Sequence, residues 1–293
     1  MISCKLAGGL GNQLFQIFTT IAYALKYSKP FFFLNNHQLG NGSNGTTIRY
    51  TYWDTFLSAL KPFLKEFNTI PELMFIKEKG FQYNELPDNL EKNYSTLLVG
   101  YFQSPKYFDK YKESICKLIK LDVKQRIVKY KVKNPLNNTI NISIHFRYGD
   151  YIKYPHIYPL LDKQYYHNAL QHIIEILDLN GNTNKIISVI SVIYFCEDDS
   201  VLQTEMIINE LKVLYPYVKF QRADTLLEDW EQLLLMSLCS HNIIANSTFS
   251  WWGAYLNNNP CKIVCYPDQW FQPETNKDTS TLFLEDWTPI SLS

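Results

Sequence analysis

Short apolar runs alternate along the chain with longer segments in which apolar residues recur at helical spacing. The apolar run 1–6 leads into the turn AGGLGNQ, and residues 14–27 then follow a helical pattern. Strand, glycine turn and helix together are typical of the start of an α/β nucleotide-binding unit. Further short strands are predicted at 31–34 and 97–101, with helical stretches over 105–133. This part of the chain is therefore predicted to be an α/β domain.

A shift in composition separates this part from the rest. Residues 133–139 read KNPLNNT, a polar segment rich in residues that favour loops, and this predicts a domain boundary. We expect one domain at 1–135 and a second at 136–293. Another polar segment, rich in glycine and asparagine, lies at 40–47 and is predicted to be a surface loop.

The second domain has the clearer alternation. Residues 140–146 alternate between apolar and polar, and the β-branched run 186–195 is typical of a buried parallel strand. The other predicted elements are strands at 218–220, 242–245 and 263–266, helices at 164–177, 201–214 and 230–239, and one more helix after residue 246. Strands that alternate with helices predict a parallel sheet covered on both faces, which binds ligands at the carboxyl ends of its strands.

The composition of the 293 residues narrows the class of protein. A hydrophobic share of 46% with 19% charged residues is typical of a globular protein. Lys and Arg number 28, as do Asp and Glu, and this neutral balance argues against a nucleic-acid partner. The six cysteines form no CxxC pair or zinc-ligand cluster, which indicates free thiols in a reducing compartment.

The apolar segments also bear on location. The longest, 186–196, spans about 11 residues, whereas a membrane span needs roughly 20. The amino terminus has no basic segment followed by an apolar one, so no signal peptide is predicted. We expect a cytoplasmic protein without a membrane span, and peripheral association with a membrane stays open.

Three clusters of polar residues at predicted strand ends are candidates for chemistry. The first is the turn with Gly9, Gly11, Asn12 and Gln13, after the first strand. Glycines allow a tight turn and a close approach of the backbone to a ligand, which the amides at a helix N-terminus would face. A purely structural turn explains this cluster equally well.

The second cluster, with His145, Arg147, Gly149 and Asp150, follows the strand predicted at 140–146. An arginine presents a rigid fork of N–H donors that suits phosphate oxygens, and it stays charged at every relevant pH. An internal salt bridge between Arg147 and Asp150 is an equally good interpretation.

The third cluster lies at 246–253, where a strand is predicted to turn into a helix. The hydroxyls of Ser247, Thr248 and Ser250 can cap this helix or hold a phosphate at its positive end. Capping is the commoner use of such residues.

Together the three clusters resemble the α-1,2-fucosyltransferase family, glycosyltransferase family 11. The family's GGLGNQ-F-Q stretch stands at 8–16, its H-x-R-R-G-D-Y motif at 145–151 and its S-x-F-S-W-W-G-A motif at 247–254. The resemblance runs from residue 8 to about 271, and three long motifs in the same order are highly specific. At one position Tyr148 stands where the family has a second arginine. Tyr148→Arg is therefore expected to add a charge near the donor diphosphate.

The resemblance implies an inverting transferase that moves fucose from GDP-fucose to the 2-hydroxyl of a terminal β-galactoside. It implies a GT-B-like α/β fold, in which two Rossmann-like domains with parallel sheets face a central cleft. The first domain would bind the glycan acceptor through Gly9, Gly11, Asn12 and Gln13. The second would bind the nucleotide sugar through His145, Arg147, Asp198, Asp199, Ser247, Thr248, Phe249 and Ser250.

The resemblance also implies roles within this site. Arg147 would neutralise the leaving diphosphate, on which negative charge builds up in the transition state. His145 and one of Asp198 and Asp199 would contact the nucleoside. Asp150 is the candidate base for the acceptor hydroxyl, with an ion pair to Arg147 as the alternative. No metal or other cofactor is expected.

Two other functions remain open. A metal-dependent nucleotide-sugar transferase would use Glu197, Asp198 and Asp199 as its metal site. A catalytically impaired protein that only binds glycans would explain Tyr148.

Overall fold

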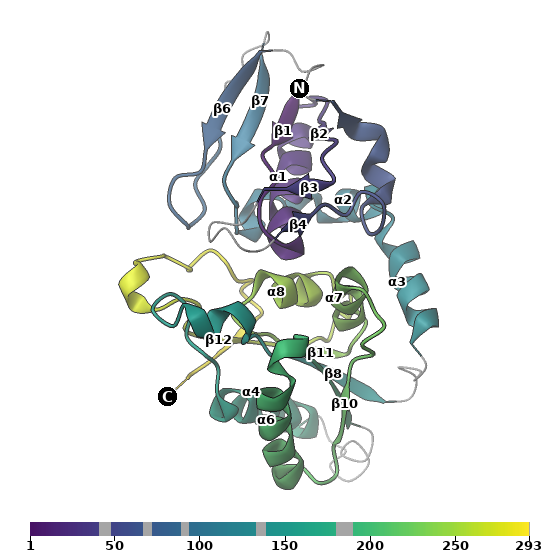
Figure 1. The fold of residues 1–293 in the computed structure, drawn as a ribbon, viewed down its shortest axis with the longest axis vertical. Coiled ribbons are helices and arrows are strands. Elements are labelled where there is room, and N and C mark those ends of the chain that lie inside the picture. Colours follow the sequence, from purple (N-terminus) through teal and green to yellow (C-terminus); the bar gives the residue numbers. More distant parts are fainter. Residues whose placement is uncertain (41–47, 67–71, 89–93, 133–138, 180–189, 293) are drawn as a thin grey trace. The chain divides into compact units, whose positions relative to one another are not determined.

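The computed structural model describes residues 1–40, 48–66, 72–88, 94–132, 139–179 and 190–292. The chain forms two compact units, Met1–Lys124 with Lys277–Leu284 and Gln125–Asn276 with Glu285–Ser293 (Figure 1). The division falls ahead of the expected boundary at 135, within helix α3 (Leu121–Lys131), and a late segment returns to the first unit. The polar segments at 41–47 and 133–138 lie outside the described residues.

A three-stranded parallel sheet forms the centre of the first unit. Its strands are β1 (Ile2–Cys4), β7 (Ser95–Val99) and β6 (Leu73–Lys77), with β7 in the middle. Helix α1 (Leu10–Lys26) follows β1 and is buried along most of its length, as its many apolar residues predict. The smaller elements of this unit are β2 (Phe33–Leu34), β3 (Gln38–Leu39), β4 (Arg49–Tyr50), β5 (Leu64–Lys65), α2 (Lys112–Leu118) and the 3-10 helices η1 (Ser58–Phe63), η3 (Pro105–Tyr107) and η4 (Asp109–Tyr111).

Six parallel strands form the sheet of the second unit, in the order β10, β9, β8, β11, β12, β13. Their bounds are β8 (Ile140–His145), β9 (Ile190–Phe195), β10 (Lys219–Arg222), β11 (His241–Ile243), β12 (Val264–Pro267) and β13 (Thr288–Ile290). Numbered along the chain this order is 3-2-1-4-5-6, that of a doubly wound nucleotide-binding fold. The winding reverses between β8 and β11, the point at which folds of this kind typically bind their ligands.

Helices cover both faces of this sheet (Figure 1). They are α4 (Lys163–Leu179), α6 (Val201–Leu214), α7 (Asp229–Ser237) and α8 (Thr248–Tyr255), with 3-10 helices η5 (Gly149–Lys153), η7 (Asp198–Ser200) and η8 (Pro273–Thr275) in the loops. The alternation of side chains along β8 shows which helices cover which face. Ile142 and Ile144 belong to the apolar core that includes side chains of α4 and α6. On the opposite face, Ser143 accepts a hydrogen bond from Asn242, whose amide also donates to the carbonyl of Met236 in α7.

The structure confirms an α/β fold with parallel sheets. The strands and helices predicted for the second domain are present, the helix at 201–214 with the same bounds and the others with shifted ends. Of the strand predicted at 186–195, residues 186–189 lie outside the described residues. The sequence analysis missed β6 and β13. Both are edge strands, and β6 is half exposed while β13 has three residues including Pro289, so neither has a clear hydrophobic pattern.

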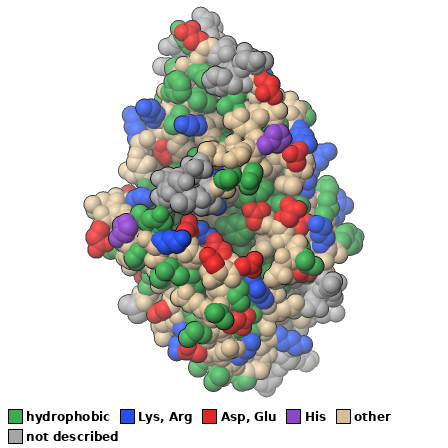
Figure 2. Space-filling view, in the orientation of Figure 1, with side chains coloured by type: hydrophobic (Ala, Val, Ile, Leu, Met, Phe, Trp, Pro, Cys, Tyr) green, Lys and Arg blue, Asp and Glu red, His purple; other side chains and the backbone are tan. Residues whose placement is uncertain are grey.

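The described helices and surface agree with the composition. Within the described ranges, none of the helices combines the length and the hydropathy that a membrane crossing requires. Acidic and basic side chains are interspersed over the face of the molecule that Figure 2 shows.

Candidate functional site

The loops after β8, β9 and β11 carry the predicted residues of the second unit. The residues in question lie at 146–150, at 196–200 and at 244–250, the last range including the first turn of α8. The three strands are parallel, and β8 lies between β9 and β11, so all three loops leave the same edge of the sheet. The structure thereby brings the central motif, the C-terminal motif and the carboxylate cluster together at the point where the winding reverses.

His145 ends β8 and connects this strand to α8. Its Nδ1 lies 2.9 Å from Oγ of Ser250, and its ring centre lies 5.5 Å from that of Phe249. Burial, followed by the positive charge of Arg147, lowers the pKa of His145 to about 3. The ring is therefore neutral at neutral pH, and it holds the first turn of α8 against the end of β8.

Two carboxylates hold the guanidinium of Arg147, which follows β8 by two residues. Nη2 donates to Oδ1 of Asp150 at 2.6 Å, and Nη1 forms an ion pair with Oε1 of Glu197. The guanidinium carbon lies 5.0 Å from the ring centre of Tyr151. The Nε–H group is buried and has no partner within the described part of the chain. The internal salt bridge that the sequence allowed is thus present, and one buried donor of the same guanidinium is not used by it.

Glu197 is the member of this cluster that the sequence analysis assigned only to a metal site. β8 and β9 pair with His145 opposite Phe195, so Arg147 and Glu197 each stand two residues beyond this pair. Gly149 makes the approach possible, because a Cβ at this position would overlap with the Glu197 carboxylate. A carboxylate directly after a buried strand was the available signal, but its partner depends on the pairing of the two strands.

Asp198 and Asp199 lie at the same edge and are each oriented by a neighbour. Oδ1 of Asp198 accepts from Nη2 of Arg222 at 2.7 Å, although Asp198 is 92% exposed. Oδ1 of Asp199 accepts from the hydroxyl of Ser200 at 2.7 Å, and this hydroxyl oxygen accepts from the N–H of Gly149 at 3.1 Å. The buried Ser200 therefore links the loop after β8 to the loop after β9.

The three carboxylates after β9 do not converge on one point. Glu197 is paired with Arg147, whereas Asp198 and Asp199 are oriented by other neighbours. Among the described residues, no group of three His, Cys, Asp or Glu side chains is arranged to hold a metal ion. The metal-dependent alternative stays a prediction, which activity in the presence of EDTA would test.

The turn between β11 and α8 places the third motif. Oγ of Ser247 accepts from the N–H of Phe249 at 3.3 Å, so Ser247 caps the helix. The buried hydroxyl of Ser250 donates toward the carbonyls of Ala245 and Ser247 at 3.4 and 3.3 Å. Thr248 and Phe249 are partly exposed in the first turn, at the positive end of the helix.

Tyr148 does not lie with Arg147, so the expectation that arginine at this position adds a charge at the site is wrong. The side chain is 1% exposed and belongs to the apolar core of the second unit. Its hydroxyl donates to the carbonyl of Leu161 at 2.7 Å. An arginine here would enter the core, and Tyr148 therefore offers no support for a catalytically impaired protein.

The predicted residues of the first unit lie between β1 and α1, and two of them hold neighbouring loops. Nε2 of Gln13, which is buried, donates to the carbonyls of Gly8 at 3.0 Å and Tyr50 at 2.8 Å. Oδ1 of Asn12 accepts from Nε2 of Gln103 at 3.0 Å. These contacts agree with the structural interpretation of the turn.

The glycines and Gln16 complete this turn. Gly9 is the N-cap residue of α1, and Gly11 is buried in its first turn. Gln16, which the sequence analysis did not single out, accepts from the N–H of Ala7 at 3.0 Å and donates to the carbonyl of Gly100 at 2.8 Å. A role of the turn in acceptor binding stays a prediction.

Comparison with known proteins covers almost the whole chain. The sequence model of glycosyl transferase family 11 matches residues 1–291. An α-1,2-colitosyltransferase of Escherichia coli is 26% identical over 295 residues, which cover 94% of this chain and 93% of the relative. The O-antigen biosynthesis glycosyltransferase WbnK of Escherichia coli is 29% identical over 321 residues, which cover 98% and 99%.

Solved structures give a weaker likeness. A complex of an Arabidopsis thaliana FUT1 mutant with GDP has a TM-score of 0.47 and 10% identity, covering 94% of this chain and 72% of that chain. Fucosyltransferase NodZ from Bradyrhizobium has a TM-score of 0.43 and 11% identity, covering 87% and 91%. Likeness at this level supports no inference about function.

The burial of Tyr148 predicts two different losses of stability. Tyr148→Phe leaves the Leu161 carbonyl without its hydroxyl partner, so the free energy of unfolding should fall by about 1–2 kcal/mol. Tyr148→Arg places an unpaired charge in the core and should cost at least about 3 kcal/mol. Urea denaturation of both variants measures these differences. A Tyr148→Arg variant as stable as the wild type would mean that this side chain does not lie in the core.

Proposed function

This chain belongs to glycosyl transferase family 11, and from this premise we propose that it is an inverting α-1,2-fucosyltransferase. As a glycosyltransferase it acts on a nucleotide sugar and a glycan acceptor. We assign fucose from GDP-fucose as the transferred sugar and the 2-hydroxyl of a terminal β-galactoside as the acceptor. The names of the two relatives, an α-1,2-colitosyltransferase and an O-antigen biosynthesis glycosyltransferase, support an α-1,2 linkage and a glycan product.

The observation that carries the proposal is the position of Arg147. It follows β8 at the reversal of the winding, with a buried Nε–H group that has no partner among the described residues. When the bond between the sugar and the diphosphate breaks, negative charge grows on the leaving phosphate. A fixed guanidinium would stabilise that charge. The backbone amides in the first turn of α8, which begins at the same edge of the sheet, would add the positive end of the helix dipole.

Asp198 and Asp199 support the choice of guanine as the base. An ionised carboxylate only accepts hydrogen bonds, and the Watson–Crick edge of guanine presents two N–H donors. Both carboxylates are exposed at the edge of the sheet that carries Arg147. The neutral His145 holds α8 in place beside this region.

Asp150 is the proposed catalytic base, which takes the proton of the acceptor hydroxyl. The oxygen of the acceptor attacks the anomeric carbon as the bond to the diphosphate breaks, and the hydroxyl proton passes to the carboxylate. The Asp150 side chain is 43% exposed, so it can meet an acceptor while Oδ1 keeps its bond to Arg147. The reaction as proposed needs no metal or other cofactor.

A donor panel tests the proposal. We expect the purified protein to transfer fucose from GDP-fucose to β-galactosides, with an α-1,2 linkage by NMR, in preference to UDP- and CMP-sugars. GDP-colitose is included because the name of one relative specifies colitose as the transferred sugar. Faster transfer from GDP-colitose would correct the sugar but keep the class. Loss of activity in EDTA would support the metal-dependent alternative, and binding of GDP without any transfer would contradict an active enzyme.

Recognition of the guanine base is tested separately, by GDP binding to variants of the two carboxylates. Asp198→Asn and Asp199→Asn should weaken GDP binding, one more than the other, by about 10-fold if a charged hydrogen bond is lost. Asp286→Asn, an exposed carboxylate ahead of the amino end of β13, should bind GDP as the wild type does. If neither Asp198 nor Asp199 affects binding in calorimetry, these residues do not recognise the base.

Arg147 should matter more for turnover than for donor affinity, because its contact strengthens as charge develops. Arg147→Ala should lower turnover by about 100- to 1000-fold. Arg147→Lys should recover little, because an ammonium lacks the fork of donors. Kinetics and circular dichroism melts on both variants check this. A purely structural salt bridge would make Arg147→Ala and Asp150→Ala lose melting temperature alike and keep the turnover of the folded protein.

Glu197 should oppose donor binding, because its carboxylate and the diphosphate compete for the same guanidinium. Glu197→Gln keeps an oxygen acceptor but removes the charge, so the Kd for GDP should fall about fivefold, less at high salt. Asp150→Asn is the matched control: it should tighten GDP binding similarly but lose turnover if Asp150 is the base. Weaker GDP binding by Glu197→Gln would instead show that Glu197 serves to orient Arg147.

A further inference from the structure

The segment that ends in α3 carries a surplus of positive charge. Residues 110–132 contain eight basic and two acidic residues, in a chain whose net charge is zero. Most of these basic side chains are exposed, among them Lys120, Arg126 and Lys129. The neutral balance of the whole chain therefore conceals a basic segment that lies along one helix and the residues before it.

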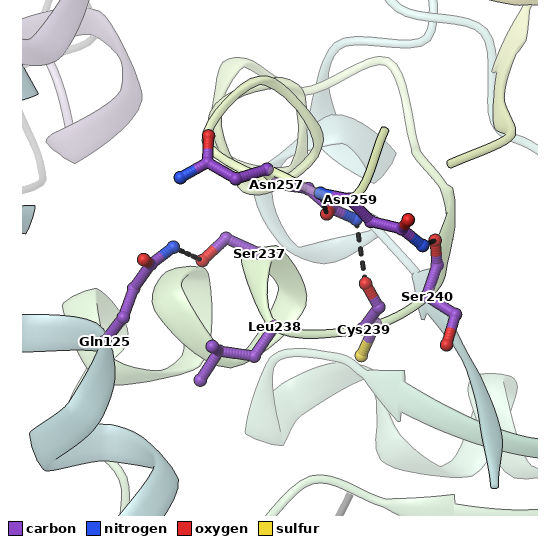
Figure 3. Close-up of a pocket in the computed structure, with 8 residues that line it drawn as sticks. Gln125, Ser237, Leu238, Cys239, Ser240, Asn257 and Asn259 are labelled. Carbon is purple, nitrogen blue, oxygen red and sulfur yellow. Dashed lines mark hydrogen bonds between the residues drawn. The ribbon is translucent and has the colours of Figure 1, made fainter. Parts of the chain in front are cut away.

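One face of α3 is buried and accounts for its attachment. Leu121 and Val128 are 2% and 0% exposed. Gln125 donates to Oγ of Ser237 at 2.8 Å (Figure 3), and Lys131 forms an ion pair with the buried carboxylate of Glu231. Gln125 and Ser237 line a cavity of 270 Å³ together with the asparagines after α8. This face of the helix is thus occupied by contacts within the protein.

The opposite face of α3 is also apolar, although it is exposed. Val123, Ile127 and Tyr130 are 37%, 42% and 88% exposed and follow one another at helical spacing. Arg126 and Lys129 lie among them. Green and blue side chains lie together at the right-hand edge of the view in Figure 2, where Figure 1 shows α3. A helix that buries one apolar face and exposes another among cations has more apolar surface than its fold requires.

We propose that this face of α3 docks the protein onto the surface of a membrane that contains anionic lipids. A helix that lies in the interface places its apolar side chains among the acyl chains and its lysines and arginines among the headgroups. Anionic headgroups attract exposed basic side chains, and the attraction falls with salt. Nucleic acid is the other polyanion of this charge, but its phosphates would engage only the cations and leave Val123 and Ile127 without a role.

Cosedimentation of the full chain with vesicles tests this docking. We expect binding to phosphatidylcholine vesicles that contain phosphatidylglycerol, and little binding to phosphatidylcholine alone. The triple variant Val123→Ser/Ile127→Ser/Tyr130→Ser should weaken binding at least about tenfold. Arg126→Gln/Lys129→Gln should also weaken it and make it less sensitive to salt. GDP binding reports separately on the fold of the second unit and on the proposed transferase site.

Helix α6 offers the matched control. Its Leu202, Met206 and Val213 are 85%, 68% and 79% exposed, but the residues around them are mainly polar or acidic. Leu202→Ser/Met206→Ser/Val213→Ser should bind vesicles as the wild type does. The proposal is overturned if the chain ignores phosphatidylglycerol, if the α6 variant loses as much binding as the α3 variant, or if only the cations of α3 matter and DNA displaces the vesicles.

Discussion

The alternation of side chains along β8 is the constraint on which the second unit depends. Ile142 and Ile144 pack into the core beneath α4 and α6, while Ser143 and His145 face the polar contacts of α7 and α8. A shift of one residue in register would exchange these two sets and bury polar groups in an apolar core. The position of Arg147 beyond the strand follows from the same register, so the core and the site are specified together.

The balance of charge around Arg147 connects stability to binding. A partly buried guanidinium without a counter-ion would be costly, and Asp150 and Glu197 remove that cost in the free protein. The same two carboxylates repel an anionic ligand. Under the proposed function, a diphosphate would have to compete with Asp150 and Glu197 for Arg147, so residues from two separate loops would set its affinity.

A residue's place in a family motif does not by itself show what its side chain does. Ser247 of the C-terminal motif caps a helix. Tyr148, which stands where the family has an arginine, packs in the core and not in the candidate site. Charge likewise depends on where it lies along the chain: the net charge is zero, but residues 110–132 are basic. In each case the place of a side chain in the fold decides which groups it can contact.

The sequence by itself determined the α/β class, most strands and helices of the second unit, and the family, because hydrophobic periodicity and motifs are local features of the chain. It left the edge strands β6 and β13 unseen, since short or half-exposed strands have little periodicity. Only the tertiary structure decided that Glu197 meets Arg147 and that Tyr148 turns into the core. The first result depends on the register of His145 against Phe195, and the second on the packing of Tyr148 into the core beside Leu161; residues so far apart in sequence are brought together only by the fold.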